Sequence, residues 1–183
     1  MAKALLNVPY FSQLDPQDGP QGWRQCQTSA IGMCLAYLKQ PLIKDDVDYL
    51  KFVQSCGDTT SQAAHNCALG KLGAPGKFSQ RLGVADIKAS LLRGFPVAIG
   101  ILHHGPVTDP SGGGHWITVK GFDDALGCWY VHDPYGDLNL VSGRWDRVGN
   151  ASGRNLRYSY QNMNPRWVPE GVTGNTGWGW VFG

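Results

Sequence analysis

The sequence lacks both a strong net charge and a long apolar run, and each shortage argues against a class of function. The 16 lysines and arginines nearly balance the 14 aspartates and glutamates, so the formal net charge of the 183-residue chain is only +2. Without a basic run, that charge does not predict binding to nucleic acid. No apolar run approaches the roughly 18 residues of a membrane-spanning helix, and residues 1–9 hold too short an apolar core for a signal peptide. We therefore expect synthesis in the cytoplasm and no membrane span.

The sequence also lacks any regular spacing of its cysteines. An odd number of them in a chain without a signal peptide predicts reduced thiols rather than a disulfide framework. No CxxC pair is present, and Cys56 with the His65-x-Cys67 pair gives only a weak indication of zinc. We therefore expect no metal ion and no other cofactor. The five cysteines are Cys26, Cys34, Cys56, Cys67 and Cys128.

The length and the order of the apolar patterns predict one α+β domain, residues 1–183. Apolar residues recur at helical spacing through about residues 1–95 and predict helices over residues 27–39, 45–56, 61–72 and 84–93. Short apolar or alternating runs in about residues 96–183 predict antiparallel strands over residues 96–102, 115–122, 128–133, 155–161 and 178–182. We expect the last strand to close an edge of the sheet. Helices first and strands second is the order of α+β proteins.

One cysteine, Cys26, lies where a turn runs into the first predicted helix. The first backbone N–H groups of a helix have no partner within it, and the helix dipole adds partial positive charge there. A thiol at this place loses its proton more readily, and the thiolate is the nucleophilic form. A lone cysteine before an apolar helix is more often a small core residue. Cys26 therefore becomes a candidate nucleophile only if the chain also supplies a base and an orienting group.

Two of the predicted strands are close enough in the sequence to form a hairpin. With residues 123–127 as its loop, Phe122 pairs with Cys128. Counting back from that pair sets His115, at the start of the first strand, opposite Tyr135 just beyond the second. The hairpin thus places a histidine beside the residues that follow the second strand.

In this register Asp133 is the diagonal neighbour of His115 on the same face, within reach of its side chain, and His132 points to the other face. A register shifted by one residue would instead set His115 opposite Pro134 and remove Asp133 from its face. A carboxylate beside an imidazole fixes its tautomer and stabilises the imidazolium. The first register therefore predicts Cys26 as nucleophile, His115 as base and later acid, and Asp133 as the orienting group.

Four short motifs follow one another along the chain: VPYFSQ at residues 8–13, CQTS at 26–29, GGGHWI at 112–117 and YVHDPYG at 130–136. In this order they resemble the papain-like cysteine peptidases related to the bacteriocin-processing, double-glycine peptidase domain, over most of the chain. The resemblance implies a papain-like fold, with a helical half packed on an antiparallel sheet. It also implies an active site of Cys26, His115 and Asp133 with a glutamine that donates to the oxyanion.

Three glutamines precede the nucleophile. Gln13 matches the first motif of the resemblance, Gln21 has the shorter spacing usual in papain-like enzymes, and Gln25 directly precedes Cys26. We favour Gln13, with the backbone N–H of Cys26 as the second oxyanion donor. The expected substrate contacts are the motif neighbours of the catalytic residues, which are Gln25, Gly114 and Trp116.

The residues after the nucleophile bear on the substrate. The Cys-Gly-Pro of the transporter-linked processing peptidases is replaced by Cys26-Gln27-Thr28, which argues against a double-glycine leader. Family members with this compact build resemble phage-encoded lysins, which accumulate in the host cytoplasm and then reach the cell wall. The resemblance therefore implies a peptidoglycan hydrolase that cleaves an amide or peptide bond of the stem or cross-bridge through a thioester. We expect it to act as a monomer.

Two alternatives stay open at this point. One is a peptidase that cleaves a protein, such as a phage structural protein or a host regulatory protein. The other is a non-catalytic module that binds the cell wall or a protein on a peptidase scaffold. The aromatic residues near the C-terminus either stack on sugar rings of a wall substrate or pack in the core. They are Trp167, Trp178, Trp180 and Phe182.

Overall fold

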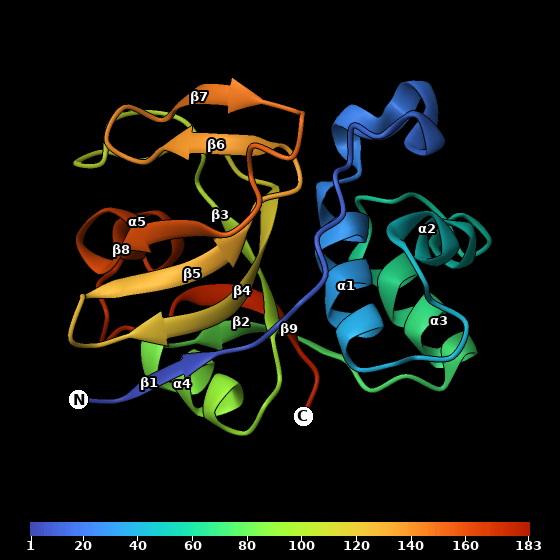
Figure 1. Ribbon diagram of the computed structural model, residues 1–183, viewed down its shortest axis with the longest axis horizontal. Helices are drawn as coiled ribbons and strands as arrows, with labels where there is room; N and C mark the ends of the chain where they lie inside the picture. Colours follow the sequence, from blue (N-terminus) through green and yellow to red (C-terminus); the bar gives the residue numbers. More distant parts are fainter.

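The computed structural model describes all 183 residues, which form a helical layer beside a β layer (Figure 1). The helical layer contains α1 (Cys26–Tyr37), α2 (Asp46–Gln54) and α3 (Gln62–Leu72). α1 lies against the sheet, where it contacts β3 (Val97–Ile101) and β4 (His115–Asp123), while α2 packs on α1 and α3 packs on α2. This arrangement confirms the predicted α+β fold. No helix is both long enough and apolar enough to cross a membrane.

The helices begin and end at local signals in the sequence. The side chain of Asp45 caps α2 by accepting a hydrogen bond of 2.9 Å from the N–H of Asp48. Ser61 caps α3 in the same way. α3 ends at Gly73, whose φ of 58° is the left-handed conformation that favours glycine. Each such cap contributes about 1 kcal/mol, and together they explain why the predicted helix ranges agree closely with the structure.

The β layer is a seven-stranded antiparallel sheet with a separate two-stranded hairpin beside it (Figure 1). Besides β3 and β4, the strands are β1 (Lys3–Leu5), β2 (Lys77–Leu82), β5 (Cys128–His132), β6 (Gly136–Asn139), β7 (Arg144–Val148), β8 (Leu156–Ser159) and β9 (Gly177–Val181). The order in the sheet is β2–β9–β3–β4–β5–β8, and β1 also pairs with β4. β6 and β7 form the separate hairpin.

Alternate residues of the central strands serve two hydrophobic cores. Ile99 and Ile117 pack in a core with α4 (Val84–Leu92) and α5 (Tyr160–Trp167), whereas Ala98 and Trp116 pack in a core with α1, α2 and α3. Because both faces of β4 are covered, all nine of its residues are buried. The sheet thus separates the two cores and holds the start of β4 between them.

The β4–β5 hairpin differs from the predicted register at its tip and agrees with it further on. Phe122 pairs with Trp129, one residue beyond its predicted partner, so the loop is shorter than predicted. A β-bulge at Lys120 then adds one residue to β4. Beyond the bulge Thr118 lies opposite His132, which is the predicted pairing. The bulge therefore compensates for the wrong loop length before the strand reaches its functional end.

Several elements depart from the predicted division into a helical half and a sheet half. β1 and β2 lie within the part predicted to be helical, and α5 lies within the part predicted to be a sheet. The strand predicted over residues 155–161 is only β8, because Ser159 accepts a hydrogen bond from the N–H of Asn162 and so caps α5. β9 was predicted at a sheet edge and instead lies between β2 and β3. The sequence patterns predict neither β6 nor β7.

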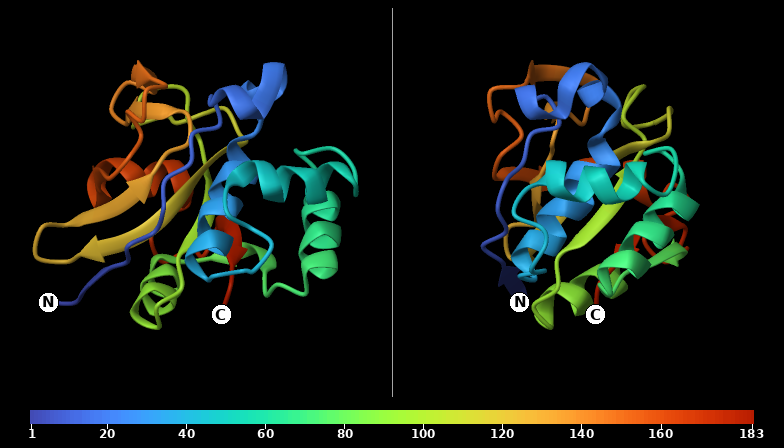
Figure 2. Two further views of the ribbon diagram at one scale, coloured as in Figure 1. Left: turned by 45° about the vertical axis from the view of Figure 1, so that its right-hand side comes forward. Right: turned by 90° about the vertical axis from the view of Figure 1, so that its right-hand side faces the viewer.

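The N-terminal segment, residues 6–13, joins the two layers. It runs from β1 along the sheet and then beside α1 (Figure 2). The hydroxyl of Tyr10 donates to the backbone oxygen of Asp133 at 3.1 Å, and the N–H of Gln13 donates to the carbonyl of Pro134 at 3.0 Å. The VPYFSQ motif therefore fixes the backbone that carries Asp133.

One disulfide corrects the prediction that all five cysteines are reduced. Cys56, just after α2, is bonded to Cys67 in α3, with 5.9 Å between their Cα atoms. The packing of α3 on α2 brings the two cysteines together, and the number of cysteines in the sequence cannot reveal that contact. The disulfide also uses both cysteines that gave the weak indication of zinc. No group of three His, Cys, Asp or Glu side chains lies close enough to hold a metal ion.

Replacing both bonded cysteines, Cys56→Ser with Cys67→Ser, is expected to lower the free energy of unfolding by about 2–3 kcal/mol. The bond closes a short loop, with a sequence separation of 11 residues, and so restricts the unfolded chain. Urea unfolding with and without dithiothreitol measures the effect. Wild type should lose stability on reduction and the double variant should not respond. A wild-type midpoint that is insensitive to reduction would contradict the prediction.

Two carboxyl groups lie buried behind the start of α1. Asp46, at the start of α2, accepts a hydrogen bond from the hydroxyl of Ser29, and Asp18 has a fully enclosed Oδ2 without a partner. Burial, followed by repulsion from Asp46, raises the pKa of Asp18 to about 7. Burial also raises the pKa of Asp46 to about 6, although the Ser29 hydrogen bond opposes this. The native protein therefore holds protons here that the unfolded chain releases at lower pH.

Replacing Asp18 with asparagine is expected to stabilise the protein increasingly as the pH rises. Between about pH 4 and pH 7 the native wild type binds more protons than its unfolded state, so its free energy of unfolding falls with pH. Asp18→Asn does not lose stability in this way. Its free energy of unfolding should exceed that of wild type by a margin that levels off above about pH 7 at about 2 kcal/mol. The margin is modest because only one oxygen of the Asp18 carboxylate is fully enclosed. Urea unfolding at several pH values measures it. The exposed Asp109→Asn is the control, and a difference independent of pH would refute the assignment.

Candidate active site

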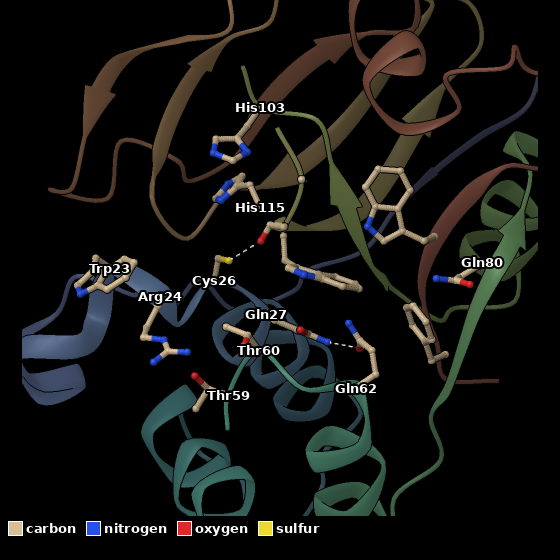
Figure 3. A pocket seen from close by; sticks show the side chains of 15 residues that line it. Trp23, Arg24, Cys26, Gln27, Thr59, Thr60, Gln62, Gln80, His103 and His115 are labelled. Carbon is tan, nitrogen blue, oxygen red and sulfur yellow. Dashed lines mark hydrogen bonds between the residues drawn. The ribbon is translucent and has the colours of Figure 1, made fainter. Parts of the chain in front are cut away.

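Cys26 is the first residue of α1 and lies half-buried at one end of the sheet (Figure 3). The preceding 3-10 segment, η1 (Pro16–Arg24), turns the chain into the helix, and the N–H of Gln25 donates to the carbonyl of Gly22 at 2.9 Å. The Cys26 thiol donates to the carbonyl of Gly114 at 3.3 Å. The thiol thus sits at the positive end of a helix dipole and faces the loop before β4.

His115, the first residue of β4, is hydrogen-bonded to Asp133 in the manner expected from the hairpin register. Its Nε2 lies 2.8 Å from Oδ1 of Asp133, and both side chains are buried. The same carboxylate oxygen accepts from the N–H of Tyr135 at 2.9 Å, so the turn after β5 holds it in place. Because Nε2 is engaged by Asp133, Nδ1 is the ring nitrogen left for the thiol of Cys26.

The environment of His115 favours its protonated form. Burial lowers the pKa of the imidazole, but the charge of Asp133, its hydrogen bond and the nearby Cys26 thiol together outweigh burial and raise the pKa to about 10. The Asp133 carboxylate therefore favours the imidazolium form of the ring. A cation beside a thiol stabilises the thiolate, which is the nucleophilic form.

Two aromatic side chains enclose the His115 ring. Trp145, from β7, meets it edge-on with 4.9 Å between the ring centroids, and the ring of Tyr135 lies 6.4 Å from His115 and 4.8 Å from Trp145. These rings keep water away from the His115–Asp133 hydrogen bond and so strengthen it. Sequence reasoning missed Trp145, since its only signal is a tryptophan within a polar stretch.

The other histidines have separate environments. His132 points away from the site, as predicted. Its Nε2 donates to the backbone carbonyl of Val8, and its Nδ1 accepts from the N–H of Asn155, both at 3.0 Å. Burial lowers the pKa of His132 to about 4, which keeps it neutral. His103 lies in the cleft, 5.6 Å from His115 between ring centroids, and burial followed by repulsion from His115 lowers its pKa to about 4 as well.

A cleft of about 690 Å³ opens over the thiol (Figure 3). Its walls combine aromatic rings with amide and hydroxyl side chains, and no carboxylate lines it. Gly114 and Trp116, two predicted substrate contacts, are among its lining residues. The others are Trp23, Arg24, Cys26, Gln27, Thr59, Thr60, Gln62, Phe78, Gln80, His103, Gly113, His115 and Trp178.

Comparison with known proteins places the chain in a family and identifies a structure with the same fold. The matching family model is that of the Peptidase_C39 like family, and it covers residues 5–164. The chain belongs to this family. A crystal structure of a C39-like peptidase from Bacillus anthracis has the same fold as this chain, with a TM-score of 0.63. The match covers 100% of this chain and 98% of that one, at 15% sequence identity. No curated protein sequence matches the chain.

In this C39-like peptidase the three candidate oxyanion glutamines lie in different places. Gln13 is buried, its Nε2 donates to the carbonyl of Gly22 at 2.9 Å, and its Oε1 has no partner. Gln25 is also buried, and its Oε1 accepts from the hydroxyl of Thr28 at 3.3 Å. Gln21 is exposed. None of the three lines the cleft, so Gln25 differs in position from the other two expected substrate contacts.

Three of the four C-terminal aromatic residues pack in the cores, and the fourth lines the cleft. Trp167, Trp180 and Phe182 are almost fully buried in the hydrophobic cores. Trp178 instead lines the cleft, where it lies against β3. Core packing therefore explains most of the C-terminal aromatic content of this C39-like peptidase, and one tryptophan is left to contact a ligand.

Proposed function

We propose that this protein is a cysteine peptidase in which Cys26 is the nucleophile, His115 the general base and acid, and Asp133 the orienting group. The observation that carries the proposal is the buried hydrogen bond of 2.8 Å between His115 and Asp133 beside a half-buried thiol at a helix start. Membership of a peptidase family supports the same reaction class.

The proposed reaction runs through a thioester. The Cys26 thiolate attacks the carbonyl carbon of the scissile amide, and negative charge moves to the carbonyl oxygen. The N–H of Cys26, at the start of α1, is placed to donate to that oxygen. When the C–N bond breaks, the leaving amine takes a proton from the His115 imidazolium. Neutral His115 then removes a proton from the water that attacks the thioester, and the C–S bond breaks to restore the Cys26 thiolate beside the His115 imidazolium.

Gln13 is proposed as the second oxyanion donor. Its Nε2 carries two hydrogens, and one of them is used by the carbonyl of Gly22. We propose that the second hydrogen donates to the oxyanion, which requires the substrate carbonyl to reach behind the cleft lining, because Gln13 does not itself line the cleft. The buried surroundings of Gln13 hold the amide in one orientation, which is what a preorganised donor requires.

Peptidoglycan is the proposed substrate, cleaved at an amide or peptide bond of the stem or cross-bridge in the manner of a phage lysin. The aromatic faces of Trp116 and Trp178 suit sugar rings or apolar peptide groups. Gln27, Gln62 and Gln80 supply amide groups that pair with peptide or acetamido groups. The Cys56–Cys67 disulfide supports action in an oxidising environment such as the cell wall.

Cleavage of a protein is the second candidate, favoured by the fold shared with a C39-like peptidase of Bacillus anthracis. Mass spectrometry of soluble fragments released from purified peptidoglycan separates the two. We expect fragments that end at one bond of the stem or cross-bridge with wild type, and none with Cys26→Ala. Intact walls together with cleavage of a reduced, unfolded protein would overturn the peptidoglycan proposal and support the second candidate.

A further inference from the structure

Trp23 and Arg24 form one end of the cleft, beside the nucleophile (Figure 3). The side chain of Trp23 is 65% exposed, and no other tryptophan or phenylalanine is exposed to this degree. The guanidinium of Arg24 lies 6.0 Å from the centroid of the Trp23 ring. An exposed indole at the mouth of a cleft is typical of a ligand contact, because a core role would bury it.

The backbone under these two side chains is held firmly. The carbonyl of Gly22 accepts hydrogen bonds from Nε2 of Gln13 and from the N–H of Gln25, both at 2.9 Å. A Cβ on Gly22 would lie only 2.3 Å from the carbonyl oxygen of Gln13, so the turn packs closely against the N-terminal segment. Trp23 and Arg24 are therefore presented from a fixed turn rather than from a free loop.

Arg24 keeps most of its donors available to a ligand. Its Nη2 is 2.9 Å from both carboxylate oxygens of Asp58. Asp58 is itself held by Thr60, whose N–H and hydroxyl donate to Oδ1 at 2.8 and 2.6 Å. Nε and Nη1 of Arg24 carry further N–H donors. Arg24 is also the only lysine or arginine that lines the cleft, and no carboxylate lines it.

We propose that Trp23 and Arg24 form a subsite that binds a free carboxylate of the substrate, with the Trp23 ring covering the apolar group that carries it. This inference rests on the proposed function and specifies the substrate as an acidic peptide. Guanidinium groups bind carboxylates with directed hydrogen bonds. The exposed indole beside Arg24 offers an apolar face to the group that carries the carboxylate. A basic ligand fits less well, because Asp58 lies outside the cleft lining and is already bound by Arg24 and Thr60.

The test compares purified peptidoglycan with the same material after carbodiimide and ammonia have converted its free carboxylates to carboxamides. We expect wild type to cleave the untreated walls roughly tenfold faster in kcat/KM. Arg24→Gln should cleave both at the lower rate, and Arg24→Lys should keep part of the preference. Arg147→Gln removes an arginine of an exposed ion pair that does not line the cleft and should keep the full preference. Equal rates of wild type on both walls, or an unchanged preference in Arg24→Gln, would overturn the subsite.

Asp58→Asn separates carboxylate binding from a merely structural role of the Arg24–Asp58 pair. If Arg24 only holds the loop that carries Asp58, then Asp58→Asn should reproduce the loss seen with Arg24→Gln, and the proposal fails. If Arg24 binds the substrate, Asp58→Asn frees its guanidinium and the preference should persist or increase. Trp23→Ala is expected to raise KM at least threefold on both walls, and an unchanged KM would remove Trp23 from the subsite.

The subsite can fail or stand independently of the peptidoglycan proposal. If walls remain intact and a protein is cut, the same comparison is made on two peptides that differ only by Glu or Gln beside the cleaved bond. If nothing is cut, calorimetry measures binding of the same two peptides to Cys26→Ala. A preference for the Glu peptide that disappears in Arg24→Gln supports the subsite, and the absence of that preference overturns it.

Discussion

Replacing Cys26 with alanine is expected to abolish hydrolysis, with kcat reduced by at least about 10⁴-fold. The substitution removes the atom that forms the thioester, and neither of the other free thiols can replace it because Cys34 and Cys128 are buried. Release of fragments from peptidoglycan, or cleavage of an unfolded protein, measures the loss. Cys128→Ser is the matched control, since this residue lies in β5 away from the cleft and should leave kcat within about twofold.

Alkylation with iodoacetamide tests the same residue without a substrate. Wild type should be labelled at Cys26 alone at neutral pH, faster than a free thiol, because the His115 imidazolium and the helix dipole favour the thiolate. Mass spectrometry locates the label. A Cys26 that reacts no faster than a free thiol, together with no activity of wild type on peptidoglycan or on an unfolded protein, would instead favour the non-catalytic binding module.

Replacing Asp133 with asparagine is expected to lower kcat on the order of 10³-fold and to change its pH dependence. Asparagine still accepts through its oxygen but carries no charge. The pKa of His115, raised to about 10 in wild type with Asp133 as the main opponent of burial, should therefore fall. Wild type should keep its protonated imidazole until about pH 10, whereas Asp133→Asn should lose it at lower pH. Profiles of kcat/KM between pH 6 and about pH 11, which extend past the pKa of about 10 in wild type, measure the shift.

Asp137→Asn is the control for that experiment. Asp137 lies in β6, four residues from Asp133, and forms an exposed ion pair with Arg147 rather than a contact with the imidazole. It should leave both kcat and the pH profile unchanged, since such exposed pairs contribute little. An Asp133→Asn protein with the wild-type alkaline limb would show that the aspartate does not set the protonation of His115.

The closest agreement between sequence and structure lies in the residues whose positions follow from short-range periodicity. The helix that begins at Cys26 was predicted from apolar spacing and from the turn before it, and the structure starts α1 at that residue. The proximity of His115 and Asp133 followed from counting along two adjacent strands. That count succeeded although the loop was one residue too long, because the bulge at Lys120 restored the register. The predicted strand register was therefore right where β4 and β5 carry His115 and Asp133 and wrong at the tip of the hairpin.

The sequence by itself determined the α+β fold, the helix limits, the face shared by His115 and Asp133, and the family, because these depend on neighbours a few residues apart or on short motifs. Only the tertiary structure decided which distant segments meet. It joined Cys56 to Cys67, inserted β9 between β2 and β3, and brought Trp145 over His115. It also placed Trp23 and Arg24 in the wall of the cleft beside Cys26. These contacts form when the helical layer and the sheet bury their apolar faces against each other. Residues that are far apart in the chain show no sequence periodicity that would predict such contacts.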